Sequence, residues 1–186
     1  MFNGRTGFGA MRARTEGEST TQRGAVLVEF ALVAMLLISL VFGTIDFGLT
    51  LHELQTLQHG SRAGARNGVV STFGSDWTCP IAPLSGPAGL ETQSLICLTK
   101  SNVGLDDADV RVKILFGVQG YVEGEPMVIC VQYPMKSTTG LFSPFLNGRV
   151  IEARTEMRIE EIGSATIDAV EEQSLPGGDW TSCTVG

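Results

Sequence analysis

Charged residues and histidines are scarce in this chain of 186 residues. Lys, Arg, Asp and Glu make up 18% of it, below the roughly 25% typical of soluble domains. The formal net charge is -7, so the chain lacks the excess of Lys and Arg with which proteins neutralise nucleic-acid phosphates. Two His and four Cys leave little material for a metal-dependent enzyme. We therefore expect no nucleic-acid partner, no metal and no cofactor.

Recognisable catalytic motifs are missing as well. No Ser lies in a G-x-S-x-G elbow, and no third ligand is spaced to join His52 and His59 in a metal site. The Gly-rich run at 117–124 lacks the G-K-[ST] ending of a phosphate-binding loop. Two pairs of carboxylates lie on polar stretches, where solvated charge is expected: Asp106/Asp107 and Glu171/Glu172. The sequence predicts that the protein is not an enzyme.

The dominant feature of the sequence is one long apolar run near the N-terminus. Residues 25–51 contain only two ionisable groups, Glu29 and Asp46, and a bilayer-spanning helix needs about 20 mostly apolar residues. We predict a transmembrane helix here, continued by a helical stalk at 52–70 because the run contains no Pro. Four Arg in residues 1–24 precede the span, so the positive-inside rule places the N-terminus in the cytoplasm and the C-terminal part outside.

An ordinary secretory signal peptide is the alternative interpretation of this run. It would have a shorter apolar region, followed by a cleavage site of small residues. The residues at 43–48, Gly-Thr-Ile-Asp-Phe-Gly, do not match the A-x-A pattern of such a site. A membrane-spanning helix is therefore the prediction.

The junction between residues 1–24 and the apolar run carries a second signal. Residues 1–24 have the composition of a disordered basic leader, and Glu29 is the fifth residue after Gly24. A carboxylate at this place either stays hydrated at the membrane surface or has a partner. The frame from Gly24 through Ala25 and Glu29 to Phe30 resembles the processing site of type IV pilin-like precursors. The resemblance implies cleavage after Gly24, which frees an α-amino group on Ala25 to pair with Glu29 of a neighbouring subunit.

Three motifs together resemble the TadE family, the pseudopilins of tight-adherence (Flp-type) pilus systems. They are Arg-Gly-Ala-Val-Leu-Val-Glu-Phe-Ala from Arg23, Gly-Thr-Ile-Asp-Phe-Gly from Gly43, and the Gly-Ala-Arg ending at Arg66. One departure is Ala-Met at 34–35, where the family often has Pro. The resemblance implies a minor pilin that is cut by a prepilin peptidase. It also implies other pilin-like subunits, pilus assembly membrane proteins and membrane lipid as partners.

Small and charged residues along the helix are candidates for helix or subunit packing: Gly43, Asp46, Gly48, Gly60, Gly64, Gly68, Arg62 and Arg66. The last three of these glycines are spaced four apart, which lets helices approach closely. Alternatively, each glycine merely weakens the helix end, by about 1 kcal/mol relative to Ala. The two Arg lie on one helical face, where a solvated position is the alternative to a carboxylate partner.

The rest of the chain has the pattern of a small domain. Residues 71–109 are rich in Ser, Gly and Pro and predict a loop region, in which a disulfide between Cys79 and Cys97 would contribute roughly 3 kcal/mol. Cys183 would pair with Cys130, although four Cys allow three connectivities and an unpaired buried Cys130 is the alternative.

Alternating apolar residues predict an antiparallel β-sheet domain at 110–161, with a tight turn at Asn147-Gly148. Residues 162–186 are predicted to form an acidic C-terminal tail. The predicted fold class is α+β and pilin-like, with the long N-terminal transmembrane and stalk helix packed on a small antiparallel sheet of three or four strands.

Two functions fit this organisation. The first is a pilin-like minor subunit in the bacterial cytoplasmic membrane, processed after Gly24 and acting in pilus initiation, tip formation or assembly. Whether it enters the extracellular pilus is left open. The alternative is an uncleaved single-pass membrane protein whose external domain serves as an assembly factor or receptor. A membrane-tethered exported enzyme is a third class, with little in the sequence to support it.

Overall fold

The computed structural model describes residues 18–71, 74, 78–163 and 165–186, with side chains from Gly24 onward. The chain forms two compact units, Met1–Val41 and Phe42–Gly186. In the first unit the described side chains belong to the apolar run. The second unit holds the end of the same helix, two shorter helices and a four-stranded sheet, counted over the described residues. This arrangement confirms the predicted α+β class.

The long helix α1 spans Glu18–Val69. It begins before Ala25, where the sequence predicted the helix to start, because extending an existing helix adds one backbone hydrogen bond for each residue fixed. The last residues of the predicted leader are therefore helical. Residues 1–17, which make up most of that leader, lie outside the described residues.

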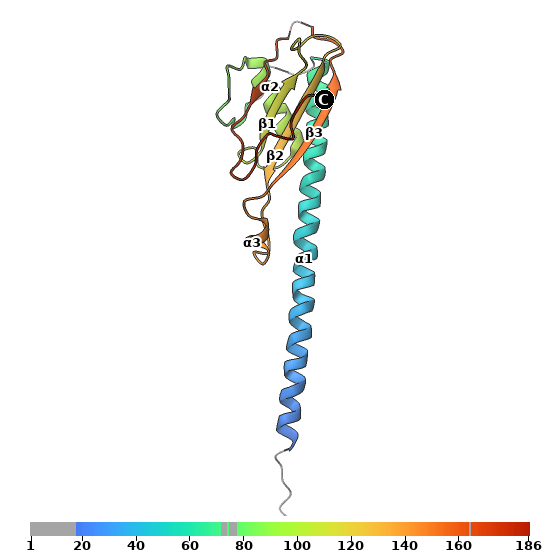
Figure 1. The fold of residues 1–186 in the computed structure, drawn as a ribbon, viewed down its shortest axis with the longest axis vertical. Coiled ribbons are helices and arrows are strands. Elements are labelled where there is room, and N and C mark those ends of the chain that lie inside the picture. The colour runs from blue at the N-terminus through green and yellow to red at the C-terminus, as the bar shows by residue number, and fades with distance from the viewer. Residues whose placement is uncertain (1–17, 72–73, 75–77, 164) are drawn as a thin grey trace, which may run out of the picture. The chain divides into compact units, whose positions relative to one another are not determined.

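The sheet is antiparallel, with the strand order β3-β2-β1-β4 (Figure 1). Its strands are β1 (Arg111–Phe116), β2 (Pro126–Pro134), β3 (Val150–Arg158) and the short β4 (Val170–Glu171). Strands β1 and β3 lie where alternating side chains predict them, and β2 coincides with the mostly apolar run between Pro126 and Pro134. It pairs with β1 on one side and β3 on the other. The last strand falls in the predicted tail.

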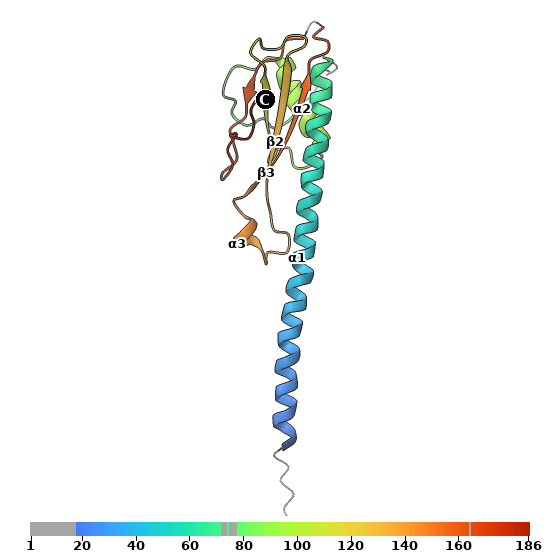
Figure 2. The same cartoon turned by 45° about the vertical axis from the view of Figure 1, so that its right-hand side comes forward.

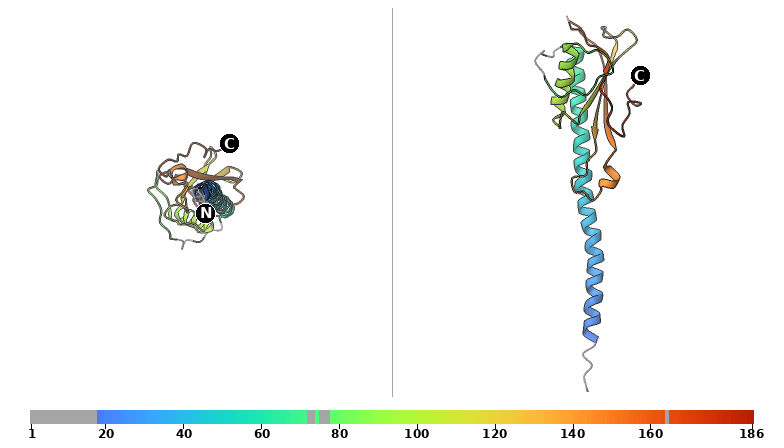
Figure 3. Two further views of the ribbon diagram at one scale, coloured as in Figure 1. Left: turned by 90° about the horizontal axis from the view of Figure 1, so that it is seen from below. Right: turned by 90° about the vertical axis from the view of Figure 1, so that its left-hand side faces the viewer.

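One face of the sheet packs against two helices, the end of α1 and α2 (Leu90–Val103) (Figure 3, right). The core between them includes Leu57 of α1, Leu95 of α2 and Ile129 of β2, each fully buried. The prediction of a loop region at 71–109 was therefore wrong in part. Because α2 buries most of its length against α1 and the sheet, tertiary packing outweighs its weak amphipathic pattern.

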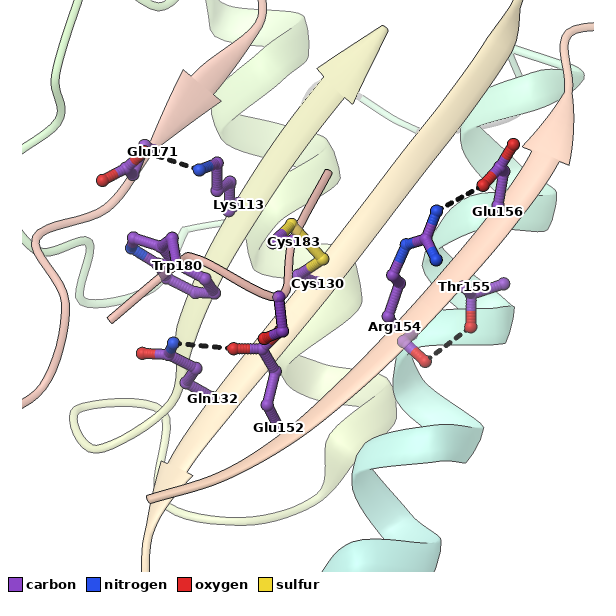
Figure 4. Close-up of a disulfide and its surroundings, with 12 residues drawn as sticks. Lys113, Cys130, Gln132, Glu152, Arg154, Thr155, Glu156, Glu171, Trp180 and Cys183 are labelled. Carbon is purple, nitrogen blue, oxygen red and sulfur yellow. Dashed lines mark hydrogen bonds and ion pairs between the residues drawn. A yellow bond between two sulfur atoms is a disulfide. The ribbon is translucent and has the colours of Figure 1, made fainter. Parts of the chain in front are cut away.

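The other face of the sheet is covered by the end of the chain. Trp180 and Cys183 are buried against Val128 and Cys130 of β2. Figure 4 shows Trp180 beside the Cys130–Cys183 disulfide. The Trp180 Nε1–H donates to the Glu172 carbonyl at 3.0 Å. The segment is acidic as predicted, but the prediction that it forms a tail was wrong, because a disulfide and an aromatic side chain attach it to the sheet. Both disulfides are present, Cys79–Cys97 and Cys130–Cys183.

A projecting segment, residues 135–149, connects β2 to β3, and we call it the arm. It contains the short helix α3 (Ser143–Leu146) and lies beside α1 (Figure 2). The Met135 N–H donates to the Arg149 carbonyl at 2.9 Å and closes the base of the arm. The turn expected at Asn147-Gly148 is formed here, and Gly148 adopts a φ of 81°, which a residue with a side chain rarely takes.

Candidate functional site

The centre of the site is Asp46, in the Gly-Thr-Ile-Asp-Phe-Gly motif of α1. Its side chain is 4% exposed, although its helix neighbours Ile45 and Phe47 are 45% and 66% exposed. The carboxylate accepts hydrogen bonds from the Ser137 hydroxyl at 2.7 Å and the Thr138 N–H at 3.2 Å. It accepts two more from Thr139, from the N–H at 3.1 Å and the hydroxyl at 2.7 Å. Asp46 therefore fastens the arm to the helix.

The sequence of the arm explains why it can supply these donors. Ser137 and Thr139 have short hydroxyl side chains, which bond readily to nearby acceptors and to the local backbone. The Ser137 Oγ also accepts the Gly140 N–H at 3.1 Å, so the turn is closed by the same side chain that contacts Asp46. Gly140 has a φ of 76°, which permits the reversal of direction.

A groove of about 500 Å³ lies next to this bond network, between α1 and the arm. Its walls are mostly apolar, with the charged groups of Asp46 and Arg149 among them: Gly43, Asp46, Phe47, Thr50, Met135, Phe142, Phe145, Leu146 and Arg149. A Cβ on Gly43 would lie 3.3 Å from the Phe142 ring, so glycine at this position permits close contact of the ring with the helix. Gly43 and Asp46 thus make their contacts within the chain, with residues of the arm.

Gly48, the remaining member of the motif, has a different environment. A Cβ built there meets nothing within 4 Å. Gly48 therefore contributes no close contact among the described residues, and the structure leaves its predicted packing role untested.

The three glycines farther along α1 contact the rest of the same unit. A Cβ on Gly60 would lie 2.3 Å from the Val103 side chain and 2.9 Å from its backbone nitrogen. A Cβ on Gly64 would lie 2.3 Å from the Thr99 hydroxyl, and one on Gly68 would lie 2.5 Å from the Met127 methyl. These glycines therefore let α2 and β2 approach α1 closely. The sequence left open whether these glycines allow close packing or only weaken the helix end. The structure shows close packing, between segments of the same chain.

Arg62 and Arg66 are exposed on α1, as are His52 and His59. Among the described residues, no group of three or more His, Cys, Asp or Glu is placed to hold a metal ion.

A buried ion pair that the sequence did not reveal joins four segments of the sheet domain. Lys100 of α2 and Glu172 are both fully buried, with 2.8 Å between Nζ and Oε1. Glu172 also accepts the Ala82 N–H at 2.7 Å and the Val112 N–H at 2.6 Å, and Lys100 donates to the Pro80 carbonyl at 2.7 Å. Burial lowers the pKa of the Lys100 ammonium. The expectation of solvated charge at Glu172 was therefore wrong.

Glu171, the other half of that carboxylate pair, bonds Lys113 at 2.9 Å, and Lys113 lies 5.8 Å from the centre of a Trp180 ring (Figure 4). A regular hydrophobic pattern could not have identified either pair, because the partners are distant in the chain. These contacts hold segments of the sheet domain together.

Glu53 is the one carboxylate of α1's second half with an unsatisfied atom among the described residues. Its Oε2 is buried without a hydrogen-bond partner, and burial raises the pKa of this carboxyl. The positive charges of Lys136 and His52 oppose that shift in part. Glu53 is thus a partly desolvated carboxyl within the electrostatic reach of Lys136, at the base of the arm.

The predicted processing residues all lie on the exposed surface of α1. Gly24, Ala25 and Glu29 are exposed, and Phe30 is 70% exposed. From Gly24 the helix is long and apolar enough to cross a membrane, with a mean hydropathy of 2.7 in its most apolar window. None of that window is buried. An apolar surface of this size needs lipid or other helices around it.

These features define a class: a single-pass, membrane-anchored α+β protein whose sheet domain carries two disulfides and is fastened to its helix through Asp46. The family model described as TadE-like protein matches residues 24–66 and confirms the predicted family resemblance. The match indicates a membrane protein associated with a tight-adherence pilus system. No curated protein and no solved structure matches the chain.

Proposed function

We propose that this chain is a pilin-like minor subunit of a tight-adherence pilus system. In this proposal a prepilin peptidase cuts after Gly24, the N-terminus faces the cytoplasm, and the sheet domain lies outside the membrane. The subunit acts in pilus initiation, tip formation or assembly and has no enzymatic activity. Its partners are other pilin-like subunits and the membrane proteins that assemble the pilus.

The observation that carries the proposal is the frame of Gly24, Ala25 and Glu29 at the start of an apolar helix surface that the described residues leave uncovered. Such a surface is stable in lipid and can also pack against the same surface of other subunits. A new α-amino group on Ala25 would neutralise Glu29 of a neighbour, which lowers the cost of keeping a carboxylate in an apolar helix bundle.

Mass spectrometry of the protein from its native membrane tests the processing step. We expect a mature N-terminus at Ala25. Gly24→Val should keep its leader, because it changes the residue after which the peptidase cuts. A Cβ at Gly24 meets nothing within 4 Å, so the fold itself should not change. Gly48→Val, at a second open helical glycine, is the matched control and should be processed normally. An intact leader in the unaltered protein would contradict the proposal.

The second candidate is an uncleaved membrane protein whose sheet domain binds a partner as an assembly factor or receptor. The exposed helix surface supports membrane anchoring in this case too. Shearing of surface fibres separates the two functions. A fibre subunit would appear in the sheared fraction, whereas a permanently anchored assembly factor would stay with the membrane and keep residues 1–24.

A further inference from the structure

The arm places a second exposed apolar surface directly beside the apolar helix. Phe145 and Leu141 of the arm are 71% and 48% exposed, and Phe47 of α1, on the same groove as Phe145, is 66% exposed. In the sheet domain, the other large apolar side chains that are strongly exposed among the described residues lie away from the arm, at Leu90 and Val118. The arm therefore adds its apolar tip to the surface of the helix.

The Asp46 carboxylate, which lies beside the arm on α1, is buried and therefore does not form part of that apolar surface. The Asp46 carboxylate accepts four hydrogen bonds from residues 137–139 and is 4% exposed. A bare carboxylate on the helix would oppose contact with lipid. Because the arm itself supplies the donors, the helix and the tip of the arm together present apolar side chains without an open charge at Asp46.

The arm lies along α1 at the level where a helix that enters the hydrocarbon core near Ala25 would leave it. A hydrocarbon core of about 30 Å takes up about 20 helical residues at about 1.5 Å each, so a span that starts near Ala25 leaves the core close to Thr44. The arm contacts α1 at Gly43 and Asp46. With that start of the span, both contacts fall at the boundary between the hydrocarbon core and the headgroup layer.

We propose that the arm is a second membrane contact, and that the groove between arm and helix is filled by the acyl chain of a membrane lipid. Phe145 and Leu141 insert into the interface on the side of the sheet domain. The groove supplies an apolar wall from Phe47, Phe142 and Leu146. Arg149, exposed at the rim, places a cation at the level of the lipid phosphates. This requires only that the helix is anchored in a membrane and does not depend on cleavage after Gly24.

Continuity with the membrane helix is the argument for lipid as the occupant. The groove is formed by α1 residues that belong to the end of the apolar span, so a lipid that surrounds the span also reaches the groove. A neighbouring subunit is the competing occupant of the groove. Lipid around the arm would admit oxygen and exclude a water-soluble reagent, whereas a protein partner would exclude both.

Spin labels on the full chain, reconstituted at one copy per nanodisc of phosphatidylethanolamine and phosphatidylglycerol, test the proposal. Labels are attached at Phe145→Cys and Leu141→Cys. The control is Val118→Cys, fully exposed in the β1–β2 connection, which the sheet places at the end opposite the arm. Mass spectrometry confirms that both native disulfides remain. Collision rates are measured with oxygen, which concentrates in lipid, and with a water-soluble nickel complex.

We expect the oxygen-to-nickel ratio at Phe145 and Leu141 to exceed that at Val118 severalfold. A ratio at Phe145 equal to that at Val118 would overturn the proposal, because the arm would then face water. Shielding of Phe145 from both reagents would also overturn it, since that result is typical of a protein–protein contact. Two labelled positions guard against a local disturbance by either label.

Discussion

Two hydrogen bonds join Asp46 and Thr139, which are 93 residues apart in the chain. The backbone N–H of Thr139 donates to Oδ1 and its hydroxyl donates to Oδ2, so a single residue of the arm binds both oxygens of one carboxylate of the helix.

Asp46→Ala should release the arm from α1, because it removes the acceptor of four hydrogen bonds at once. Trypsin cleavage after Lys136 and Arg149, at the two ends of the arm, should become faster. Asp46→Asn keeps one oxygen acceptor and should give an intermediate rate. Equal cleavage rates in all three proteins would show that Asp46 does not hold the arm.

Gly60→Ala should destabilise the protein by about 1–3 kcal/mol, because the added methyl group meets the Val103 backbone and forces α2 away from α1. Gly48→Ala is the control, since nothing lies within 4 Å of a Cβ there and stability should be unchanged or higher. Urea unfolding in detergent measures both. If Gly60→Ala and Gly48→Ala change the free energy of unfolding equally, the close approach of α1 and α2 does not contribute to stability.

Lys100→Met should be strongly destabilising, by about 3–5 kcal/mol, because it leaves the Glu172 carboxylate buried without its counterion. Lys136→Met removes a Lys whose ion pair with Asp109 is largely exposed and should cost less than about 1 kcal/mol. Thermal unfolding compares them. A small effect of Lys100→Met would mean that water reaches Glu172.

Glu53→Gln should change the pH dependence of stability. The pKa of Glu53 is raised by burial above its ordinary value of 4.5, so the folded state retains a proton that the unfolded state has already lost. Stability from this group is present below pH 4.5 and is lost as the pH rises through the raised pKa. Glu53→Gln should remove that loss and be more stable at neutral pH.

Denaturant unfolding over an acidic-to-neutral pH series measures the effect of Glu53→Gln. Glu123→Gln, at an exposed carboxylate of the β1–β2 connection, is the control. It should leave the change in the free energy of unfolding with pH as it is in the unaltered protein. A parallel pH profile for Glu53→Gln and the unaltered protein would contradict the prediction.

The elements that the sequence predicted well are those with a strong local pattern. The apolar run made α1 evident, and the alternation of apolar and charged side chains located β1 and β3. Helix α2 was missed because its apolar residues, such as Leu95 and Ile96, do not form a regular stripe and follow a stretch rich in Pro and Gly. Contacts with α1 and the sheet decide its structure, and those are not visible locally.

The candidate site was predictable in part. Asp46 stood out as a carboxylate in an apolar helix, but its partners lie in a loop whose fold depends on β2 and β3. Glu172 was assigned to solvent because its neighbours are polar, while its counterion Lys100 is 72 residues away. Such pairs depend on the tertiary structure, for which one sequence without its relatives offers no signal.

Trp180 and Cys183 cover one face of β2, and this packing affects the order in which the domain folds. Cys79 and Cys97 are 18 residues apart, whereas Cys183 must return over 53 residues to Cys130. The nearer pair closes the smaller loop and loses less chain entropy. Since Trp180 and Cys183 follow β1, β2 and β3 in the chain, one side of the sheet stays open until the segment at 180–183 has been synthesised. A chain that stops before Cys183 would remain in that open, association-prone state, so the arrival of this segment is itself a checkpoint for the quality of the subunit.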